Sequence, residues 1–152
     1  MHKLLTAIAV VGLMAGPAAA SDKTDVMTVI QQWVDGFNKA DMQVMMGQCA
    51  DQTSIIDDIA PHEWHGSGAC TRWWNAYQAD AKKNEITDGI VTLSTPRHVD
   101  VTGNRAYVVI PVESFTYKAK GKPEKESGSV VTLILRKGES GWRITAWAWA
   151  QG

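Results

Sequence analysis

The chain has 152 residues, of which 45% are hydrophobic, and its formal net charge at pH 7 is −1. This length suits one domain built around a single hydrophobic core. Binding to nucleic-acid phosphates requires a clear excess of lysine and arginine. The balance of 15 basic and 16 acidic residues therefore argues against nucleic acid as a partner.

The N-terminal segment is typical of a secretory signal peptide. Lys3 supplies a positive charge, positions 4–14 form an apolar run, and three consecutive alanines precede the expected cleavage site. The run is too short to span a bilayer comfortably, and an uncleaved N-terminal anchor is the alternative. We expect a signal peptide over residues 1–20 and export to the periplasm or medium. Residues 21–152 would then form one mature domain without membrane attachment.

Two helices are predicted before the first strand. Asp22, Thr24 or Asp25 can cap a helix whose apolar residues recur at helical spacing. Residues 38–41 interrupt this pattern, and Asp41 is suited to cap a second, shorter helix that is rich in methionine. The apolar positions of the first helix are Val26, Val29, Ile30, Trp33, Val34 and Phe37.

A short apolar strand is predicted next, over residues 53–57, and it ends in a carboxylate. Residues 58–65 contain a proline and are predicted to form a loop. Ser67 or Gly68 then begins a third helix, and the cations of Lys82 and Lys83 suit its C-terminal end. The apolar positions of this helix are Cys70, Trp73, Trp74, Tyr77 and Ala81.

Export changes the interpretation of the two cysteines, Cys49 and Cys70. In an oxidising compartment they are candidates for a disulfide. The bond would close a loop of about twenty residues, which the chain-entropy treatment values at ~3 kcal/mol. A pair of buried thiols and a catalytic cysteine are the alternatives. No nearby histidine in a helix-start environment would lower a thiol pKa.

The remainder of the chain is predicted to be sheet. A Gly-Asn turn between two β-rich runs is a hairpin signal. The last three strands follow one another through tight turns and would form an antiparallel meander. The predicted fold class is α+β, with helices first and an antiparallel sheet after them. The expected strands span residues 90–94, 97–101, 105–118, about 125–137, and 142–150.

Neither face of this predicted sheet is plainly polar. Tyr107 and Val109 alternate with Ala106 and Val108, whereas a half-solvated sheet would alternate apolar with polar residues. Large apolar surfaces are seldom left exposed to water. We expect helices to cover one face and a second copy of the chain, in a homodimer, to cover the other. A strongly curved monomeric sheet that partly buries its own back is the alternative.

Asp57 is the main candidate for a catalytic residue. It follows two isoleucines, and aromatic residues flank it in sequence, so burial should raise its pKa. Such a carboxylate is a usable general base for removing a proton next to a carbonyl. It could instead accept loop N–H bonds and only fix the loop. His65 is the second candidate, either as a partner of Asp57 or as a loop histidine bonded to backbone.

A metal or cofactor is not expected. His62, Glu63 and His65 lie close to Asp57 in sequence, but they belong to a predicted loop, where two imidazole rings need not converge on one ion.

The chain contains seven tryptophans, which is a high number for its length. Aromatic residues at helical or strand spacing are usually core residues, but indoles also commonly line ligand pockets. We therefore predict an apolar pocket that binds a small apolar molecule. Its expected lining is Trp33, Phe37, Trp64, Trp74, Tyr77 and Trp147.

The order of several short motifs resembles the NTF2-like superfamily, in particular its SnoaL-like and ketosteroid-isomerase-like members. The motifs are FNKAD at residues 37–41, AD at 50–51, IID at 55–57, WHG at 64–66 and GWRI at 141–144. The resemblance covers nearly the whole mature chain. It implies a cone in which three N-terminal helices pack on a strongly curved antiparallel sheet, with ligands entering the cone.

The resemblance also implies roles for individual residues. Aligned with the ketosteroid isomerases, Asp57 matches the general base, while Trp33 and Trp74 match two tyrosines of the oxyanion site. The protonated acid of that site falls near Thr132, which we add to the expected pocket. This sequence therefore keeps a carboxylate at the position of the general base, but it does not keep the residues of the oxyanion site. The implied activity is a cofactor-independent isomerase, dehydratase or cyclase, with a non-catalytic ligand-binding or protein-interaction domain as the alternative.

Overall fold

The computed structural model describes residues 17–152, so positions 1–16 of the expected signal peptide lie outside the described residues. Three helices are described: α1 (Pro17–Asn38), α2 (Met42–Gln48) and α3 (Ala69–Lys83). The strands are β1 (Cys49–Ile56), β2 (Glu63–Ser67), β3 (Ile86–Leu93), β4 (His98–Thr102), β5 (Arg105–Ala119), β6 (Lys122–Glu126), β7 (Val130–Gly138) and β8 (Gly141–Ala150).

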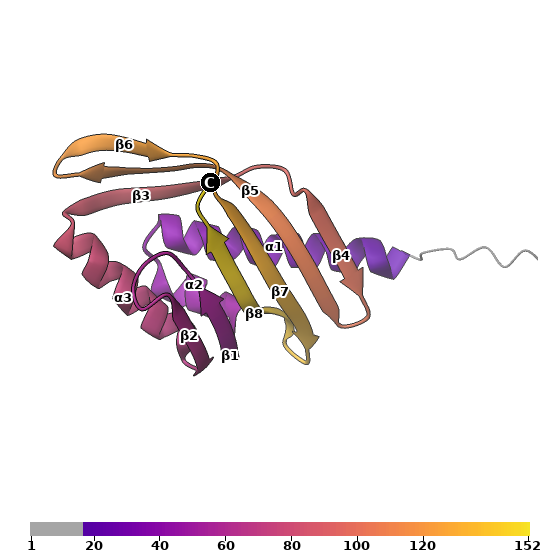
Figure 1. Ribbon diagram of the computed structural model, residues 1–152. Helices are drawn as coiled ribbons and strands as arrows, with labels where there is room; N and C mark the ends of the chain where they lie inside the picture. The colour runs from indigo at the N-terminus through magenta and orange to yellow at the C-terminus, as the bar shows by residue number, and fades with distance from the viewer. Residues whose placement is uncertain (1–16) are drawn as a thin grey trace, which may run out of the picture.

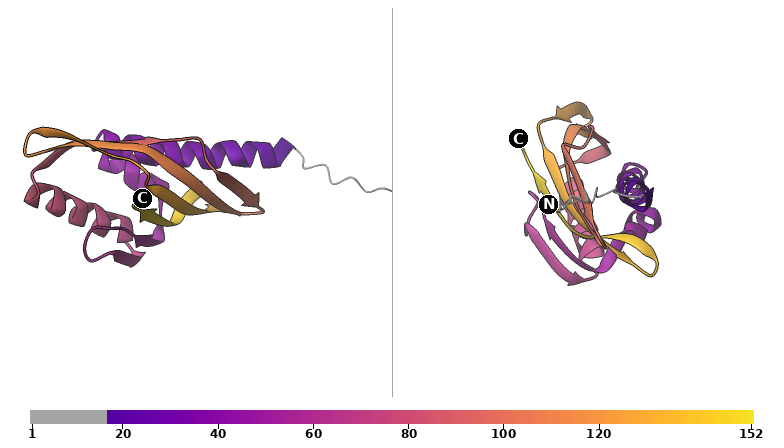
Figure 2. Two further views of the ribbon diagram at one scale, coloured as in Figure 1. Left: turned by 45° about the horizontal axis from the view of Figure 1, so that its top comes forward. Right: turned by 90° about the vertical axis from the view of Figure 1, so that its right-hand side faces the viewer.

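The eight strands form one curved sheet in the order β2-β1-β8-β7-β5-β3, with β4 and β6 also paired to β5 (Figure 1). The long strand β5 joins two parts of this sheet. Its first half, residues 105–111, pairs with β7 and β4, and its second half, residues 112–119, pairs with β3 and β6. The helices lie on the concave side of the sheet, and α1 runs across the strands (Figures 1 and 2). The α+β fold class is therefore confirmed.

Three features of the sheet differ from expectation. Strand β2 begins within the loop predicted over residues 58–65 and pairs antiparallel with β1, because its alternating pattern buries Trp64 and exposes Glu63 and His65. Strand β1 pairs in parallel with β8, whereas the sequence predicted an antiparallel sheet. The single strand expected at residues 125–137 is divided into β6 and β7 around Gly128, whose φ of 90° is readily adopted only by glycine.

The first helix begins before its expected capping residues. Asp22 lies within α1, and its Oδ1 accepts hydrogen bonds from Lys137 Nζ at 2.6 Å and Trp142 Nε1 at 3.2 Å. These two hydrogen bonds, the lysine's first, lower the pKa of Asp22. This carboxylate therefore ties α1 to the β7–β8 hairpin. The second predicted cap is confirmed, since Asp41 accepts from Val44 N at 3.1 Å at the start of α2.

The core lies between the helices and the inner face of the sheet. A register shift in the β7–β8 pair places both Ile144 and Trp147 on this face, although strict alternation predicts opposite faces. Gly36 allows α1 to approach α2, because a Cβ at this position would lie 2.7 Å from Met45 N. The inner face of the central strands is formed by Ala106, Val108, Ile110, Val131, Leu133 and Leu135.

A disulfide joins Cys49 to Cys70, with their Cα atoms 6.7 Å apart, so the predicted pairing is confirmed. The disulfide connects the beginning of β1 to the first turn of α3 and thereby holds these two elements together. Within residues 17–152, none of the helices combines the length and the hydrophobicity needed to cross a bilayer.

Candidate functional site

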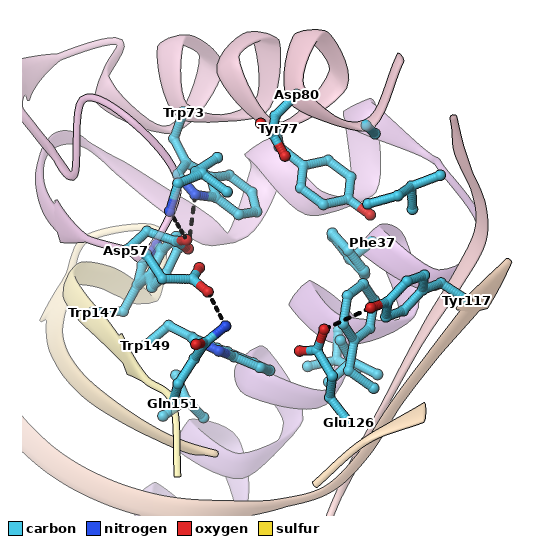
Figure 3. Close-up of a pocket in the computed structure, with 18 of the residues that line it drawn as sticks. Phe37, Asp57, Trp73, Tyr77, Asp80, Tyr117, Glu126, Trp147, Trp149 and Gln151 are labelled. Carbon is cyan, nitrogen blue, oxygen red and sulfur yellow. Dashed lines mark hydrogen bonds between the residues drawn. The ribbon is translucent and has the colours of Figure 1, made fainter. Parts of the chain in front are cut away.

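A cavity of about 180 Å³ lies between the helices and the sheet (Figure 3). Its walls come from α1, α3, β3, the second half of β5, the C-terminal end of β8, single residues of β6 and β7, and the loop that follows β1. The described residues that line it are Trp33, Val34, Phe37, Asp57, Asp58, Ile59, Trp73, Tyr77, Asp80, Ala81, Ile86, Val91, Leu93, Phe115, Tyr117, Glu126, Val131, Trp147, Trp149 and Gln151.

Five of the predicted site residues meet in this cavity. Trp33 and Phe37 reach it from α1, one helical turn apart, and Tyr77 reaches it from α3. Trp147 contributes from β8, and Asp57 lies directly after β1. The structure thus brings together residues that are separated by up to 114 positions in the sequence.

The other four predicted site residues lie elsewhere. Trp64 packs in the core through β2, and Thr132 alternates with Val131, so that Val131 lines the cavity in its place. Trp74 is buried behind the wall, with its ring edge-on to Phe37 at a centroid distance of 5.9 Å. His65 is exposed on β2 and its Nε2 lies 3.3 Å from Glu63 Oε2, so neither alternative, a contact with Asp57 or a bond to backbone, is found among the described residues.

Trp73 is an important residue of the site, although its helical spacing in the sequence indicated a core residue. Its Nε1 donates to Asp57 Oδ2 at 3.0 Å, and its ring stacks on that of Tyr77 at a centroid distance of 5.9 Å (Figure 3). Trp73, Tyr77 and Ala81 follow at intervals of four residues and share one face of α3. This spacing is visible in the sequence, but it does not say which of two adjacent indoles faces a cavity.

The carboxylate of Asp57 is held at one end of the cavity. Its Oδ1 accepts from Ile59 N at 3.2 Å, and its backbone N–H donates to His62 O at 3.0 Å, so residues 57–62 form a compact loop. Burial, with a further contribution from the neighbouring carboxylate of Asp58, raises the pKa of Asp57 to about 7. The two hydrogen bonds from Ile59 and Trp73 act in the opposite direction and are outweighed. Near neutral pH this group can therefore both accept and release a proton.

Further polar groups line the same cavity. Tyr117 donates its hydroxyl proton to Glu126 Oε1 at 2.7 Å, and this hydrogen bond raises the pKa of Tyr117 to about 12. Burial, followed by the negative charge of Asp57, raises the pKa of Tyr77 to about 12. Both phenols are therefore protonated at neutral pH and remain hydrogen-bond donors.

The aromatic wall behind Asp57 is closely packed. The rings of Trp73 and Trp147 meet at right angles with centroids 4.8 Å apart, and Trp33 contacts Trp147 at 5.3 Å. Trp147 is 3% exposed, and its Nε1 has no hydrogen-bond partner among the described residues. Among residues 17–152, no three histidine, cysteine or acidic side chains converge as ligands for a metal ion.

Comparison with known proteins places this arrangement in a family. The sequence profile of the SnoaL-like domain matches residues 26–148, which is most of the chain. The chain belongs to the SnoaL-like domain family. The expected relationship to the NTF2-like superfamily is thereby confirmed. No curated protein matches the sequence with significant similarity.

Solved structures of low sequence identity share the fold of this SnoaL-like domain. An NTF2-like superfamily protein from Salmonella enterica has a TM-score of 0.72 at 19% identity, with 87% of this chain and 92% of that chain covered. A ketosteroid isomerase-like protein from Erwinia carotovora has a TM-score of 0.67 at 14% identity, with 86% and 95% covered. An NTF2-like protein from Novosphingobium aromaticivorans with a cystatin-like fold has a TM-score of 0.69 at 13% identity, with 87% and 82% covered.

Proposed function

We propose that this SnoaL-like domain binds a small, largely apolar molecule in its cavity and acts on it with Asp57 as the general base, without a cofactor. One observation carries the proposal. A partly buried carboxylate with a pKa near 7 lines a cavity that is otherwise walled mainly by aromatic and aliphatic side chains. Perturbed carboxylates in apolar cavities are characteristic of catalytic sites.

The supported chemistry is removal of a proton from a carbon next to a carbonyl, as in an isomerisation, dehydration or cyclisation. The Asp57 carboxylate would accept the proton, and the electron pair of the C–H bond would move toward the carbonyl oxygen. The protonated hydroxyl of Tyr77 is the lining group best suited to donate a hydrogen bond to that oxygen. Asp57 would then return the proton to another position of the ligand.

A thermal-shift screen of small apolar ketones, such as 2-cyclohexenone and acetophenone, tests ligand binding. A bound ligand present at 100 times its dissociation constant should stabilise the protein by about 2.7 kcal/mol. Ala81→Phe should abolish the shift, because Ala81 lines the cavity and the larger ring would fill it. Ala79→Phe is the matched control on an exposed position of α3 and should preserve the shift. Equal shifts in both variants would contradict binding in this cavity.

A specific observation favours a non-catalytic alternative for Asp57. Both of its carboxylate oxygens already accept hydrogen bonds within the domain, from Ile59 N and Trp73 Nε1. In that alternative the carboxylate fixes the loop over residues 57–62, and the cavity only stores or carries its ligand. The consequences of Asp57→Asn separate the two functions.

We further propose that the domain is exported and forms a homodimer through the outer face of its sheet. The Cys49–Cys70 disulfide is consistent with an oxidising compartment, and Tyr107 on the outer face is 42% exposed. Native mass spectrometry of the protein recovered from the periplasm or medium tests both proposals. We expect a complex of two chains that begin at Ser21. A one-chain species would contradict the dimer, and an intact residue 1 would contradict cleavage.

A further inference from the structure

The charges around the cavity all have one sign. Four of the described lining residues are acidic, and none is a lysine, arginine or histidine. Asp57 and Asp58 follow β1, Asp80 lies on α3, and Glu126 lies on β6, so the carboxylates surround the space from three directions (Figure 3).

No cation among the described residues neutralises these four carboxylates. The ion pairs within residues 17–152 join other side chains: His65 to Glu63, Lys118 to Asp88, and Lys137 to Asp22. The four carboxylates instead accept hydrogen bonds from uncharged donors. These donors are Ile59 N and Trp73 Nε1 for Asp57, Gln151 for Asp58, Asn84 for Asp80, and Tyr117 for Glu126. The negative charge of the cavity is therefore uncompensated within the described structure.

The surfaces between the carboxylates are aromatic. Eight of the lining residues are tryptophan, tyrosine or phenylalanine. Phe37 lies at the centre of one group, with its ring centroid 5.1 Å from that of Tyr77 and 6.3 Å from that of Phe115. The face of an aromatic ring is the negative end of its quadrupole and attracts cations. The rings and the carboxylates thus favour the same kind of ligand.

We propose that the ligand of this cavity is a small organic cation, a protonated or quaternary amine with a compact apolar body. The inference rests on the proposed function and specifies its ligand class. The apolar body contacts the aromatic rings, while the cationic nitrogen lies among the carboxylates. Carboxylate and phosphate ligands are excluded by repulsion from the four acidic residues. A cavity of about 180 Å³ suits this size class, since an engineered cavity of about 150 Å³ binds benzene.

The cationic ligand also fits the proposed role of Asp57. A positive charge near a carboxylate favours its ionised form. Binding of the amine would therefore convert Asp57 from a partly protonated group into the carboxylate that a general base requires. A neutral ligand of the same shape would lack this effect.

Three probes of nearly the same shape and different charge test the proposal. They are choline, 3,3-dimethylbutan-1-ol, in which carbon replaces the charged nitrogen, and the anion 3,3-dimethylbutanoate. Dissociation constants would be measured by calorimetry with the protein recovered from the periplasm or medium, at pH 8, where Asp57 is largely ionised. We expect choline to bind about 10-fold more tightly than the alcohol, and the anion not to bind.

Glu126→Gln gives a second readout. The glutamine keeps the size of the side chain and can still accept from Tyr117, so only the charge is lost. We expect choline affinity to fall about 3-fold or more, with the affinity of the alcohol unchanged. Glu124→Gln is the matched control, because Glu124 lies on the same strand outside the cavity lining. It should leave both affinities nearly unchanged.

The outcomes separate this inference from the proposed function. If the alcohol or the anion binds as tightly as choline, the cation proposal is overturned and the apolar pocket stands. If none of the three probes binds while the ketones of the thermal-shift screen do, only the cation proposal fails. If neither series binds, both the ligand class and the proposed function fail.

Discussion

Asp57→Asn should lower the turnover of a ligand identified by either screen by at least about 100-fold, which is the usual contribution of a positioned general base. Asparagine has nearly the same size and cannot accept a proton from carbon. The measurement is kcat/KM together with the dissociation constant of the same ligand. Asp100→Asn is the control, because Asp100 is exposed on β4 and does not line the cavity.

The affinity of Asp57→Asn for its ligand distinguishes the two functions of the domain. A catalytic role predicts that a neutral ligand still binds while turnover is lost. If wild type and Asp57→Asn show equal turnover, or if neither turns over any ligand that binds, Asp57 does not act as a base. In that case the non-catalytic binding function is the correct one, and the carboxylate serves to hold the loop over residues 57–62.

Asp57→Asn should also change the pH dependence of folding. Burial raises the pKa of Asp57 from its ordinary value of 3.8 to about 7, so the folded state binds this proton more tightly than the unfolded state. Stability contributed by the protonated carboxyl is therefore fully present below about pH 4, declines as the pH rises to about 7, and is lost above that pH. The asparagine variant lacks this decline.

The expected size of this effect is moderate. The difference in pKa corresponds to at most about 4 kcal/mol, and partial exposure of Asp57 to solvent reduces this to about 2 kcal/mol. Loss of one hydrogen bond from Ile59 or Trp73 costs the variant about 1 kcal/mol at every pH. The unfolding free energy of the variant minus that of wild type should therefore rise by about 2 kcal/mol from pH 4 to pH 8.

Urea unfolding of the two proteins at a series of pH values measures this change directly. Asp100→Asn is again a suitable control, since Asp100 is exposed on β4 and does not belong to the cavity lining. It should follow the wild-type curve. A constant difference between wild type and Asp57→Asn across this pH range would show that the carboxyl is not significantly buried, which would remove the physical basis of the proposed base.

Local sequence patterns were sufficient for the elements whose signals lie within a few residues of one another. The apolar spacing of α1, the cap at Asp41, the start of α3 after Gly68 and the hairpin at Gly103 are all set by local backbone and side-chain preferences. The motifs from FNKAD to GWRI were sufficient for the superfamily, because they occur in a fixed order over most of the chain.

Long-range pairing accounts for the errors. The side chains of Ile144 and Trp147 share one face only because the register of β8 shifts against β7. Strand β2 exists because residues 63–67 pair with β1, whereas the local sequence predicted a loop up to residue 65. The sequence left open whether His65 is a partner of Asp57, and the pairing of β1 with β2 turns it toward solvent.

The sequence by itself determined the helices, most of the strands and the disulfide pair, and it identified Asp57 as the candidate base. Each of these depends on residue type, order and short-range spacing. Only the tertiary structure decided which indole contacts that carboxylate and which residues surround it. Trp73 and Trp74 are adjacent and chemically identical, yet one donates to Asp57 and the other packs behind the wall. The acidic character of the cavity is likewise a property of packing, because Asp80 and Glu126 line the same space as Asp57 only when α3 and β6 pack around it.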